Sequence, residues 1–385
     1  MSALVWRTAG ESHGGSLLGI VEGMPSGLRL SAERVDRELA RRQGGYGRGG
    51  RMKIERDRVE LLAGTRGGLT LGSPIAFRLP NRDDSIEKLG VPASARPGHA
   101  DLAGCQKHGH RDPRAIMERA SARETAARVA AGGIARQLLE HLGIEVFAHV
   151  VELGGVRADA GAFEAAGERR DALRAASAFT CLASECEEPM RAAIDAAREA
   201  GDTLGGIFEV RAVGLPPGLG GYAAAGERLT GRIGGALLSI PAIKGVEFGL
   251  GFEAARRPGS AVHDPIRLCG ERNGEGRWGR FERTTNAAGG LEGGMTTGEP
   301  LVVRAAMKPI STLRRGLPTV DFETGATVES TWQRSDVSAV PAAGVVGEAM
   351  VALELAAVVR EQFGGDSLAQ LERAWEAYRA ELDGI

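Results

Sequence analysis

The stretch GESHGGSLLGIVEGMPSGL, residues 10–28, occurs a second time in altered form, and this repetition decides the fold that we expect. Residues 201–219 read GDTLGGIFEVRAVGLPPGL, and without gaps the two stretches share seven of nineteen residues. The shared residues are glycines, one proline and one leucine, and glycine and proline set tight turns and close backbone approaches. Both stretches are therefore expected to form the same turn framework, in which His13 of the first copy stands opposite Leu204 of the second.

A second pair of stretches matches in the same order. GTRGGLTLGSPIAFR, residues 64–78, and GLEGGMTTGEPLVVR, residues 290–304, agree at seven of fifteen positions. Together the two pairs predict an internal duplication with halves at about 1–150 and 195–360, related by a pseudo-twofold axis. Chance similarity of glycine-rich stretches is the alternative, although the matched prolines and an arginine favour duplication. Halves that share one core, with no visible linker, predict a single domain over residues 1–385.

Alternating apolar residues predict strands in both halves, as in GGIFEVRAVGL, and longer periodic stretches predict helices. Two of the helices are rich in alanine and glycine, so they can pack very close to a neighbour. Strands followed by such helices favour a layered α+β fold. The helices are expected over Ser31–Arg42, Pro113–His141, Pro341–Phe363 and Ser367–Leu382.

The composition is that of an ordinary globular protein, with 43% apolar and 25% charged residues. A balance of 48 basic against 50 acidic residues does not imply a sequence-independent grip on nucleic acid or on an anionic membrane. The first residues lack the apolar core of a signal peptide, and the four cysteines form no CxxC pair. We therefore expect a soluble cytoplasmic protein with reduced thiols.

The segment ARRQGGYGRGGRMKIERDR, residues 40–58, places Arg42 and Arg48 among glycines. It formally contains GxGxxG, but it follows a helix rather than a strand, which argues against a dinucleotide-binding fold. One interpretation is an anion cradle, because guanidinium groups bind phosphate or carboxylate in a bidentate manner. The other is a solvated basic loop, and both interpretations stay open at this point.

Three further residues are candidates for proton chemistry. His13 departs from a framework that both copies retain, which favours a functional role over a structural one. His99 lies in a tight polar turn, and histidine can act as an acid or base near neutral pH. Asp336 precedes a predicted helix, where it could instead be an N-terminal cap.

The pair His108 and His110 resembles a metal-binding pair. No third or fourth ligand follows at zinc-like spacing, so we expect a surface or structural role and no metal site.

Six motifs together resemble the chorismate synthase family, in that family's order and over about Arg7 to Gly365. They are AGESHGGSLLGIVEGMPSG, RPGHADLAG, ERASARETAARVAAG, GGLEGGMTTGEPLVVR, MKPISTL and RSDVSAVPAAGVVGEAM. The resemblance implies a β-α-β sandwich with central helices between two antiparallel sheets, assembled as a homotetramer.

The resemblance also implies an activity. The family converts 5-enolpyruvylshikimate 3-phosphate to chorismate and phosphate by 1,4-anti elimination, the last step of the shikimate pathway in aromatic amino acid biosynthesis. It requires reduced FMN without net redox change. Some members reduce the flavin with NADPH themselves. Because no added domain is visible, we expect NADPH to act here only indirectly, through an external reductase.

The resemblance assigns roles to single residues. His13 would stay protonated beside the reduced flavin and substrate, His99 would assist the departing phosphate, and Asp336 would relay a proton at flavin N5, which accepts the substrate's C6 proton. Arg42 and Arg48 would bind the anionic groups of the substrate. The residues expected to hold FMN are Arg119, Ala120, Ser121, Pro241, Ala242, Gly293, Lys308, Pro309, Ile310, Ser311, Thr312 and Arg334.

The sequence departs from the family in two places. The segment SIEKLGVPAS, residues 85–94, is shorter than usual, and Ser338 stands where cysteine is frequent. Neither change removes an expected catalytic group. The alternatives are a flavin- or nucleotide-binding protein on the same scaffold without lyase activity, and a ligand-free scaffold. The retention of His13, His99 and Asp336 together favours the lyase.

Overall fold

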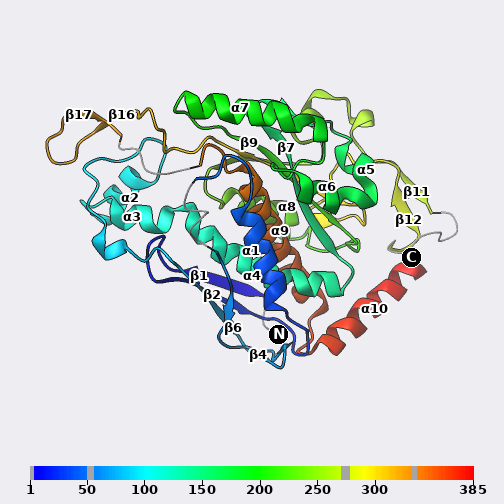
Figure 1. The fold of residues 1–385 in the computed structure, drawn as a ribbon. Coiled ribbons are helices and arrows are strands. Elements are labelled where there is room, and N and C mark those ends of the chain that lie inside the picture. Colours follow the sequence, from blue (N-terminus) through cyan, green and yellow to red (C-terminus); the bar gives the residue numbers. More distant parts are fainter. Residues whose placement is uncertain (1–3, 50–55, 270–277, 331–335) are drawn as a thin grey trace.

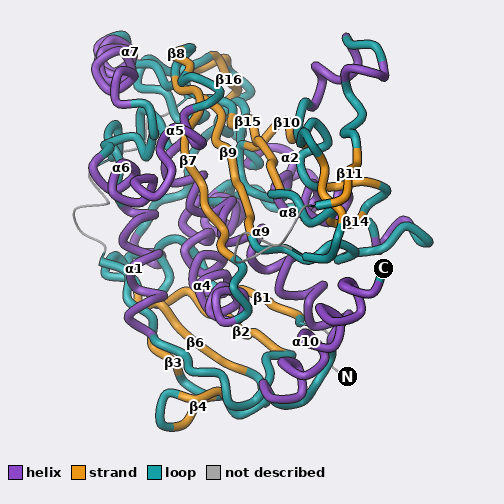
Figure 2. The backbone as a smooth tube through the Cα atoms, turned by 90° about the vertical axis from the view of Figure 1, so that its right-hand side faces the viewer, coloured by secondary structure: helices purple, strands orange, loops and turns teal. Residues whose placement is uncertain are grey.

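The computed structural model describes residues 4–49, 56–269, 278–330 and 336–385. Two antiparallel sheets lie on either side of a layer of helices, as Figure 2 shows with α4 and α9 between the strands β1, β2 and β6 and the strands β7, β9 and β15. Figure 1 shows the same elements from a perpendicular direction, with the C-terminal helix at the edge of the molecule.

The first sheet has the order β1-β2-β6-β3, with bounds Val5–Ala9, Ser16–Glu22, Ile75–Pro80 and Glu60–Leu61. Strand β2 shows the two-residue period of a half-buried strand. Leu17 and Val21 face the helices and are fully buried, whereas Leu18 and Ile20 on the other face are 45% and 44% exposed. The outer face of this sheet therefore exposes apolar side chains next to the charged Arg7, Glu22 and Arg78.

The second sheet has the order β10-β15-β9-β7-β8, with bounds Ile243–Phe248, Leu301–Met307, Gly206–Val213, Glu145–Leu153 and Val156–Arg157. Phe208, Val210 and Ala212 of β9 point into the main core and are fully buried. Phe147 and Val150 of β7 belong to a separate apolar cluster. That cluster includes residues of α5 (Ala162–Ala166) and α7 (Glu187–Glu199), and α6 (Arg170–Ala176) lies beside it.

The helical layer is built from α1 (Ala32–Gln43), α4 (Thr125–His141), α8 (Leu229–Leu238) and α9 (Val340–Phe363). Small residues allow its close packing. A Cβ added at Gly132 of α4 would lie 2.4 Å from the Cβ of Ala349 in α9, and one added at Gly347 would lie 2.4 Å from the Phe208 ring. Helix α9 is long and apolar enough to cross a membrane by composition, but 94% of its most apolar stretch is buried inside this protein.

Two predicted helix starts are confirmed by their caps. The Ser31 hydroxyl accepts a hydrogen bond from the backbone N–H of Arg34 (3.2 Å) at the start of α1. Ser367 caps α10 (Leu368–Gly384) and forms a reciprocal pair of hydrogen bonds with Gln370.

The predicted continuous helix over Pro113–His141 is wrong. Helix α3 spans Arg114–Ala120, and α4 begins only at Thr125. Between them Ser121 has extended backbone (ψ 141°), and its hydroxyl accepts from the backbone N–H of Arg123. A serine that bonds its own neighbouring backbone competes with the helix in this way.

The matched sequence blocks have matching hydrogen bonds. Thr70 donates its hydroxyl to the Pro25 carbonyl (2.6 Å) and accepts from the N–H of Leu28 (3.0 Å). Thr296 makes the corresponding bonds to Pro216 (2.6 Å) and Leu219 (2.8 Å). The two threonines lie in two corresponding hairpins, of which one joins β4 (Thr65–Arg66) to β5 (Leu69–Thr70), and the other β13 (Leu291–Glu292) to β14 (Met295–Thr296).

The remaining elements lie at the periphery. They are α2 (Asp101–His108) and two hairpins formed by β11 (Ile266–Leu268) with β12 (Phe281–Arg283) and by β16 (Pro318–Val320) with β17 (Thr327–Glu329).

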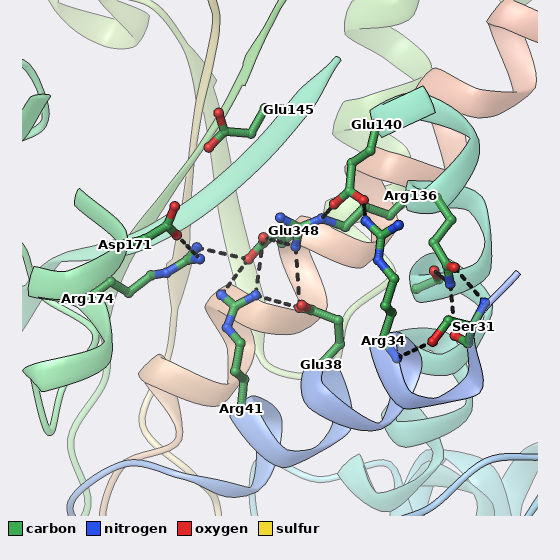
Figure 3. Close-up of polar contacts among 12 residues, drawn as sticks. Ser31, Arg34, Glu38, Arg41, Arg136, Glu140, Glu145, Asp171, Arg174 and Glu348 are labelled. Atoms are coloured by element: carbon green, nitrogen blue, oxygen red, sulfur yellow. Dashed lines mark hydrogen bonds and ion pairs between the residues drawn. The ribbon is translucent and has the colours of Figure 1, made fainter. Parts of the chain in front are cut away.

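A buried ionic cluster ties four helices together around Glu348 of α9, whose side chain is 2% exposed (Figure 3). Arg41 of α1 donates to its Oε2 (2.7 Å), Arg136 of α4 donates to its Oε1 (2.5 Å), and Arg174 of α6 lies 3.6 Å away. Burial raises the pKa of Glu348, but the three guanidinium groups outweigh it and lower the pKa well below its ordinary value. The carboxylate is therefore ionised at neutral pH.

Candidate active site

A cavity of about 650 Å³ opens beside the break between α3 and α4 and the N-terminal end of α9. Its volume is in the range of small-molecule sites. One wall is apolar and contains Ala342, Ala343 and Val346 of α9 together with Ile240 and Met307. The remaining lining residues come from α1, α3, the start of α4 and several loops that are far apart in the sequence.

Most of the residues expected at a site from the sequence line this cavity. They are His13, Arg42, Arg48, His99, Ala120, Ser121, Pro241, Ala242, Lys308, Ile310, Ser311, Thr312 and Asp336. They come from both predicted halves of the chain.

Three expected residues do not line the cavity, and one is not described. The guanidinium of Arg119 points to strand β1 instead, where it donates to the carbonyls of Thr8 and Gly10 (both 3.0 Å). Gly293 forms the turn between β13 and β14, with φ +60°, and Pro309 is absent from the cavity walls. Arg334 lies outside the described residues.

The His13 ring is held by Glu118, which lies two residues before the last residue of α3. Both carboxylate oxygens lie 3.0 Å from Nδ1, and Oε2 also accepts from the backbone N–H of His13 (2.8 Å). The other ring nitrogen, Nε2, lies 3.8 Å from Asp83. Hydrogen bonds from His13 overcome the effect of burial and lower the pKa of Glu118.

The His99 ring is held in a similar way by Asp101, whose side chain is fully buried at the start of α2. Asp101 Oδ1 lies 2.5 Å from His99 Nδ1, and its Oδ2 accepts from Arg96 Nε (2.9 Å). Burial raises the pKa of Asp101, but these hydrogen bonds dominate and lower it far below its ordinary value. Arg96 also contacts the ring of His99 through Nη2.

Arg42 is a buried cation at the edge of the cavity, with 4% of its surface exposed. It donates from Nε to the Thr125 hydroxyl (3.0 Å) and from Nη2 to the Ala122 carbonyl (2.8 Å), so it spans the helix break. Its Nη1 is buried without a hydrogen-bond partner, although Asp57 Oδ2 lies 3.9 Å from it. Burial, together with the neighbouring Arg48, lowers the pKa of Arg42 to about 10. A buried, unpartnered N–H of a cation is costly unless an anion binds there.

Asp336 is not the N-terminal cap that one interpretation of the sequence suggested, because the cap position of α9 is Ala339. Its carboxylate instead accepts from the backbone N–H of Gly49 (2.6 Å) and lies 3.1 Å from Arg48 Nη1. The arginine-rich loop and the segment before α9 are thus joined at the cavity.

The turn Pro241–Ala242 has strained backbone. Ala242 has φ +70°, a region that residues with a Cβ rarely adopt. Its carbonyl accepts from the N–H of Lys308 (2.9 Å), whose ammonium donates to the Gly98 carbonyl (2.5 Å). Strain of this kind is typical of functional sites.

The sequence interpretation missed Asp83, Arg114 and Glu118, which also line the cavity. Glu118 stands at the start of the motif ERASARET, but nothing local indicates that its partner lies 105 residues earlier. Arg96 and Arg123, which stand near turns of small residues in the sequence, also line the cavity.

The cavity is predominantly cationic. Six arginine or lysine residues line it against three acidic residues, in addition to His13 and His99. Guanidinium groups, paired imidazoles and an apolar wall suit a small metabolite with several negative charges. The fold and site thus define an enzyme pocket for a polyanionic small molecule.

Comparison with known proteins agrees with this class. The family model for chorismate synthase matches residues 4–359. A chorismate synthase of Geobacter sulfurreducens is 53% identical over 97% of this chain and 98% of its own length, and one of Rubrobacter xylanophilus is 52% identical over 97% and 96%. A crystal structure of chorismate synthase superposes with a TM-score of 0.81 at 40% identity and full coverage of both chains. The chain belongs to the chorismate synthase family, which forms chorismate in the last step of the shikimate pathway.

Proposed function

We propose that the cavity described above is where this chain converts 5-enolpyruvylshikimate 3-phosphate to chorismate and phosphate by 1,4-anti elimination. The observation that carries the proposal is the convergence of two carboxylate-bound histidines and six cationic side chains on one cavity. The substrate has a phosphate and carboxylate groups, and such a surface neutralises them. A flavin-binding protein without lyase activity is not favoured, because the relatives of this chain are chorismate synthases over nearly its full length.

Arg42 and Arg48 are the proposed substrate-binding residues. Nη1 of Arg42 has a hydrogen still to donate, and the bonds to Thr125 and Ala122 hold the fork in place. A pre-positioned fork loses little entropy when it binds an anion, which favours tight and oriented binding.

The residues of the cavity also fit reduced FMN. The apolar wall of Ala342, Ala343 and Val346 suits a flat ring, while Lys308, Ser311 and Thr312 offer donors for the polar parts. When bound, reduced flavin would supply transient electron density for cleavage of the C–O bond, which no side chain offers. The proposed FMN site consists of Ala120, Ser121, Pro241, Ala242, Lys308, Ile310, Ser311 and Thr312, and the parts assigned to Arg119, Gly293, Pro309 and Arg334 rest on the family resemblance alone.

His99, His13 and Asp336 are the proposed catalytic residues. His99 Nε2 would donate a hydrogen bond to the departing phosphate, whose negative charge grows as the C–O bond breaks. In the protonated form that the family resemblance implies, His13 would also carry a proton on Nε2 and donate a hydrogen bond from it to the anionic group beside it. The Asp336 carboxylate, held by Gly49 and Arg48, would relay a proton at the N5 position of the bound flavin, the atom that the family resemblance implies as acceptor of the substrate's C6 proton.

We further propose that the two sheets and their helices form a β-α-β sandwich that arose by internal duplication within one domain. This proposal is supported by the corresponding hydrogen bonds of Thr70 and Thr296, each of which donates to a proline carbonyl and accepts from a leucine N–H. A cytoplasmic homotetramer is the proposed assembly. Its support is the absence of disulfides at the four cysteines and the exposed apolar face of the first sheet, with Val5, Leu18 and Ile20 each more than 40% exposed. NADPH would act indirectly, through an external flavin reductase.

An anaerobic assay tests the proposed reaction. Purified protein, 5-enolpyruvylshikimate 3-phosphate and reduced FMN should release inorganic phosphate. His13→Ala should keep the fold and FMN binding while losing most turnover, and His141→Ala, whose imidazole pairs with Glu372 at the surface, should behave as wild type. Folded, flavin-binding wild-type protein that releases no phosphate would contradict the proposed function, and unfolding of His13→Ala would return His13 to a structural role.

A further inference from the structure

Glu118 contacts His13 at two places, its backbone and its ring. The carboxylate accepts from the backbone N–H of His13 (2.8 Å) and meets ring Nδ1 with both oxygens (3.0 Å each). The backbone carbonyl of Glu118 accepts from the N–H of Ser12 (2.9 Å). The last turn of α3 and the glycine-rich loop that carries His13 are thus fixed to each other by one residue.

The Glu118 side chain is nearly buried, with 4% of its surface exposed. Although burial alone would favour the neutral acid, its hydrogen bonds with His13 lower its pKa, and Arg114 lies 3.6 Å away. Glu118 is therefore an ionised acceptor at neutral pH. The charged groups that face the His13 ring are Glu118 at Nδ1, with Arg114 behind it, and Asp83 at 3.8 Å from Nε2.

An ionised carboxylate can only accept hydrogen bonds, so the proton of this contact lies on Nδ1 of His13. The bond made by one ring nitrogen sets what the other can do, and here Nε2 is the atom left for the cavity. His99 repeats the arrangement independently, because Asp101 holds its Nδ1.

We propose that Glu118 is a positioning residue for His13: it fixes the ring orientation and keeps the proton on Nδ1, so that Nε2 faces the reacting groups. This inference rests on the proposed function, because it assigns Glu118 a part in the same site. Its effect reaches the reaction only through His13.

Three variants test the proposal. Glu118→Gln keeps an acceptor oxygen without the charge, and Glu118→Ala removes both. Glu124→Gln is the matched control, because Glu124 is an equally buried acid six residues further along the chain that pairs with Arg128 rather than with a histidine. If Glu118 acts as proposed, kcat should fall in the order wild type, Gln, Ala, by at least about tenfold in Ala, since a positioned acid or base contributes roughly 10²- to 10⁴-fold. The substrate KM should change far less than kcat.

A second readout needs no substrate and no flavin. In ¹⁵N spectra of the protein alone at alkaline pH, His13 should carry its proton on Nδ1 in wild type and in the Glu124→Gln control. In Glu118→Ala the proton of neutral His13 should no longer favour Nδ1 over Nε2.

The outcomes separate the two proposals. A wild-type enzyme that turns over, with Glu118→Ala folded and equal to it in kcat and tautomer, would overturn the role of Glu118 and leave the proposed function intact. If Glu118→Ala fails to fold, Glu118→Gln carries the test. A wild-type protein without turnover contradicts the proposed function, and the ¹⁵N spectra still decide whether Glu118 sets the state of His13.

Discussion

One framework carries two different residues at the equivalent positions 13 and 204. His13 lines the cavity and is held by Glu118, whereas Leu204 packs near Gly154 at the edge of the second apolar cluster. In the proposed duplication the matched glycines Gly10 and Gly201 both have positive φ (105° and 69°), so this turn constrains the backbone there while the side chain at positions 13 and 204 can differ. A polar residue in one copy that is aligned with an apolar residue in the other copy therefore indicates a candidate functional residue, as His13 and Leu204 illustrate.

Arg42 offers a test of anion binding at the scale of one side chain. Arg42→Lys keeps the charge, but an ammonium group cannot replace the contacts of Nε with Thr125 and of Nη2 with Ala122 and also bind an anion in the place of Nη1. We expect the substrate KM to rise about tenfold or more, which corresponds to the loss of roughly one charged hydrogen bond. Inorganic phosphate at millimolar concentration should raise the Tm of wild type more than that of the variant.

Arg58→Lys serves as the control for this prediction, because the Arg58 side chain is 83% exposed. Equal KM values and equal phosphate-induced shifts in Arg42→Lys and wild type would show that the buried fork does not meet an anion.

The sequence indicated the histidines and arginines of the site but not the carboxylates that hold the histidines. His13 and His99 stand in short motifs with unusual neighbours, which makes them visible locally. Glu118 is invisible in that way, because its partner is 105 residues distant and only the packing of α3 against the loop brings them together. Asp101 lies two residues from His99, but its burial follows from the fold and not from the local sequence.

At the scale of the element, the break at Ser121 between α3 and α4 shapes the cavity, because Ser121 and Ala122 line it. Alanine-rich sequence on both sides predicts one long helix, because alanine is the best helix former and no glycine or proline lies between Arg114 and Ala131. The hydroxyl of Ser121 and the bond from Arg42 to the Ala122 carbonyl stabilise the interruption. These contacts turn backbone toward the cavity, and they depend on a residue from another helix.

The ionic cluster around Glu348 makes a pH-dependent prediction for the helical layer. Glu348→Gln leaves three guanidinium groups without their common carboxylate, so we expect the free energy of unfolding at pH 7 to fall by about 3–5 kcal/mol. Since the folded pKa of Glu348 is depressed, its stabilisation is complete above the ordinary value of 4.5 and is lost as the pH falls through the folded pKa.

Urea unfolding at pH 7 and at pH 3 measures this effect. The difference between wild type and Glu348→Gln should be large at pH 7 and smaller at pH 3. A replacement of the exposed Glu376 by Gln should leave stability unchanged at both values. A difference that stays constant with pH would mean that Glu348 titrates as an ordinary carboxylate.

At the scale of the whole molecule, the spacing of the two sheets depends on how closely α4 and α9 approach. Gly132→Ala should destabilise the protein by about 1–3 kcal/mol, because the new Cβ would lie 2.4 Å from the Ala349 Cβ and 2.6 Å from its Cα. Gly235→Ala in α8 meets nothing within 4 Å and should be neutral or stabilising by about 0.5–1 kcal/mol. Thermal or urea unfolding compares the two, and equal effects would contradict close packing as the constraint.

The main strands and most helices could be predicted, because each has a clear apolar period and a cap or a glycine at its end. The segment between β7 and β9 could not, although it contains α5, α6 and α7 and covers Phe147 and Val150. It has no counterpart in the first half of the chain, so the alignment of the two halves gives no information about its structure. The arrangement of the layers also depends on contacts between helices that no local pattern reveals.

Helix α9 is the last part of the helical layer to leave the ribosome, and both sheets are already synthesised before it. During that interval the inner faces of β7 and β9 lack the partner that covers them in the finished protein. The nascent chain is therefore expected to stay incompletely closed until about residue 363 has emerged. Until then the apolar residues of α9 and the strand faces that they cover are exposed together in one unfinished chain.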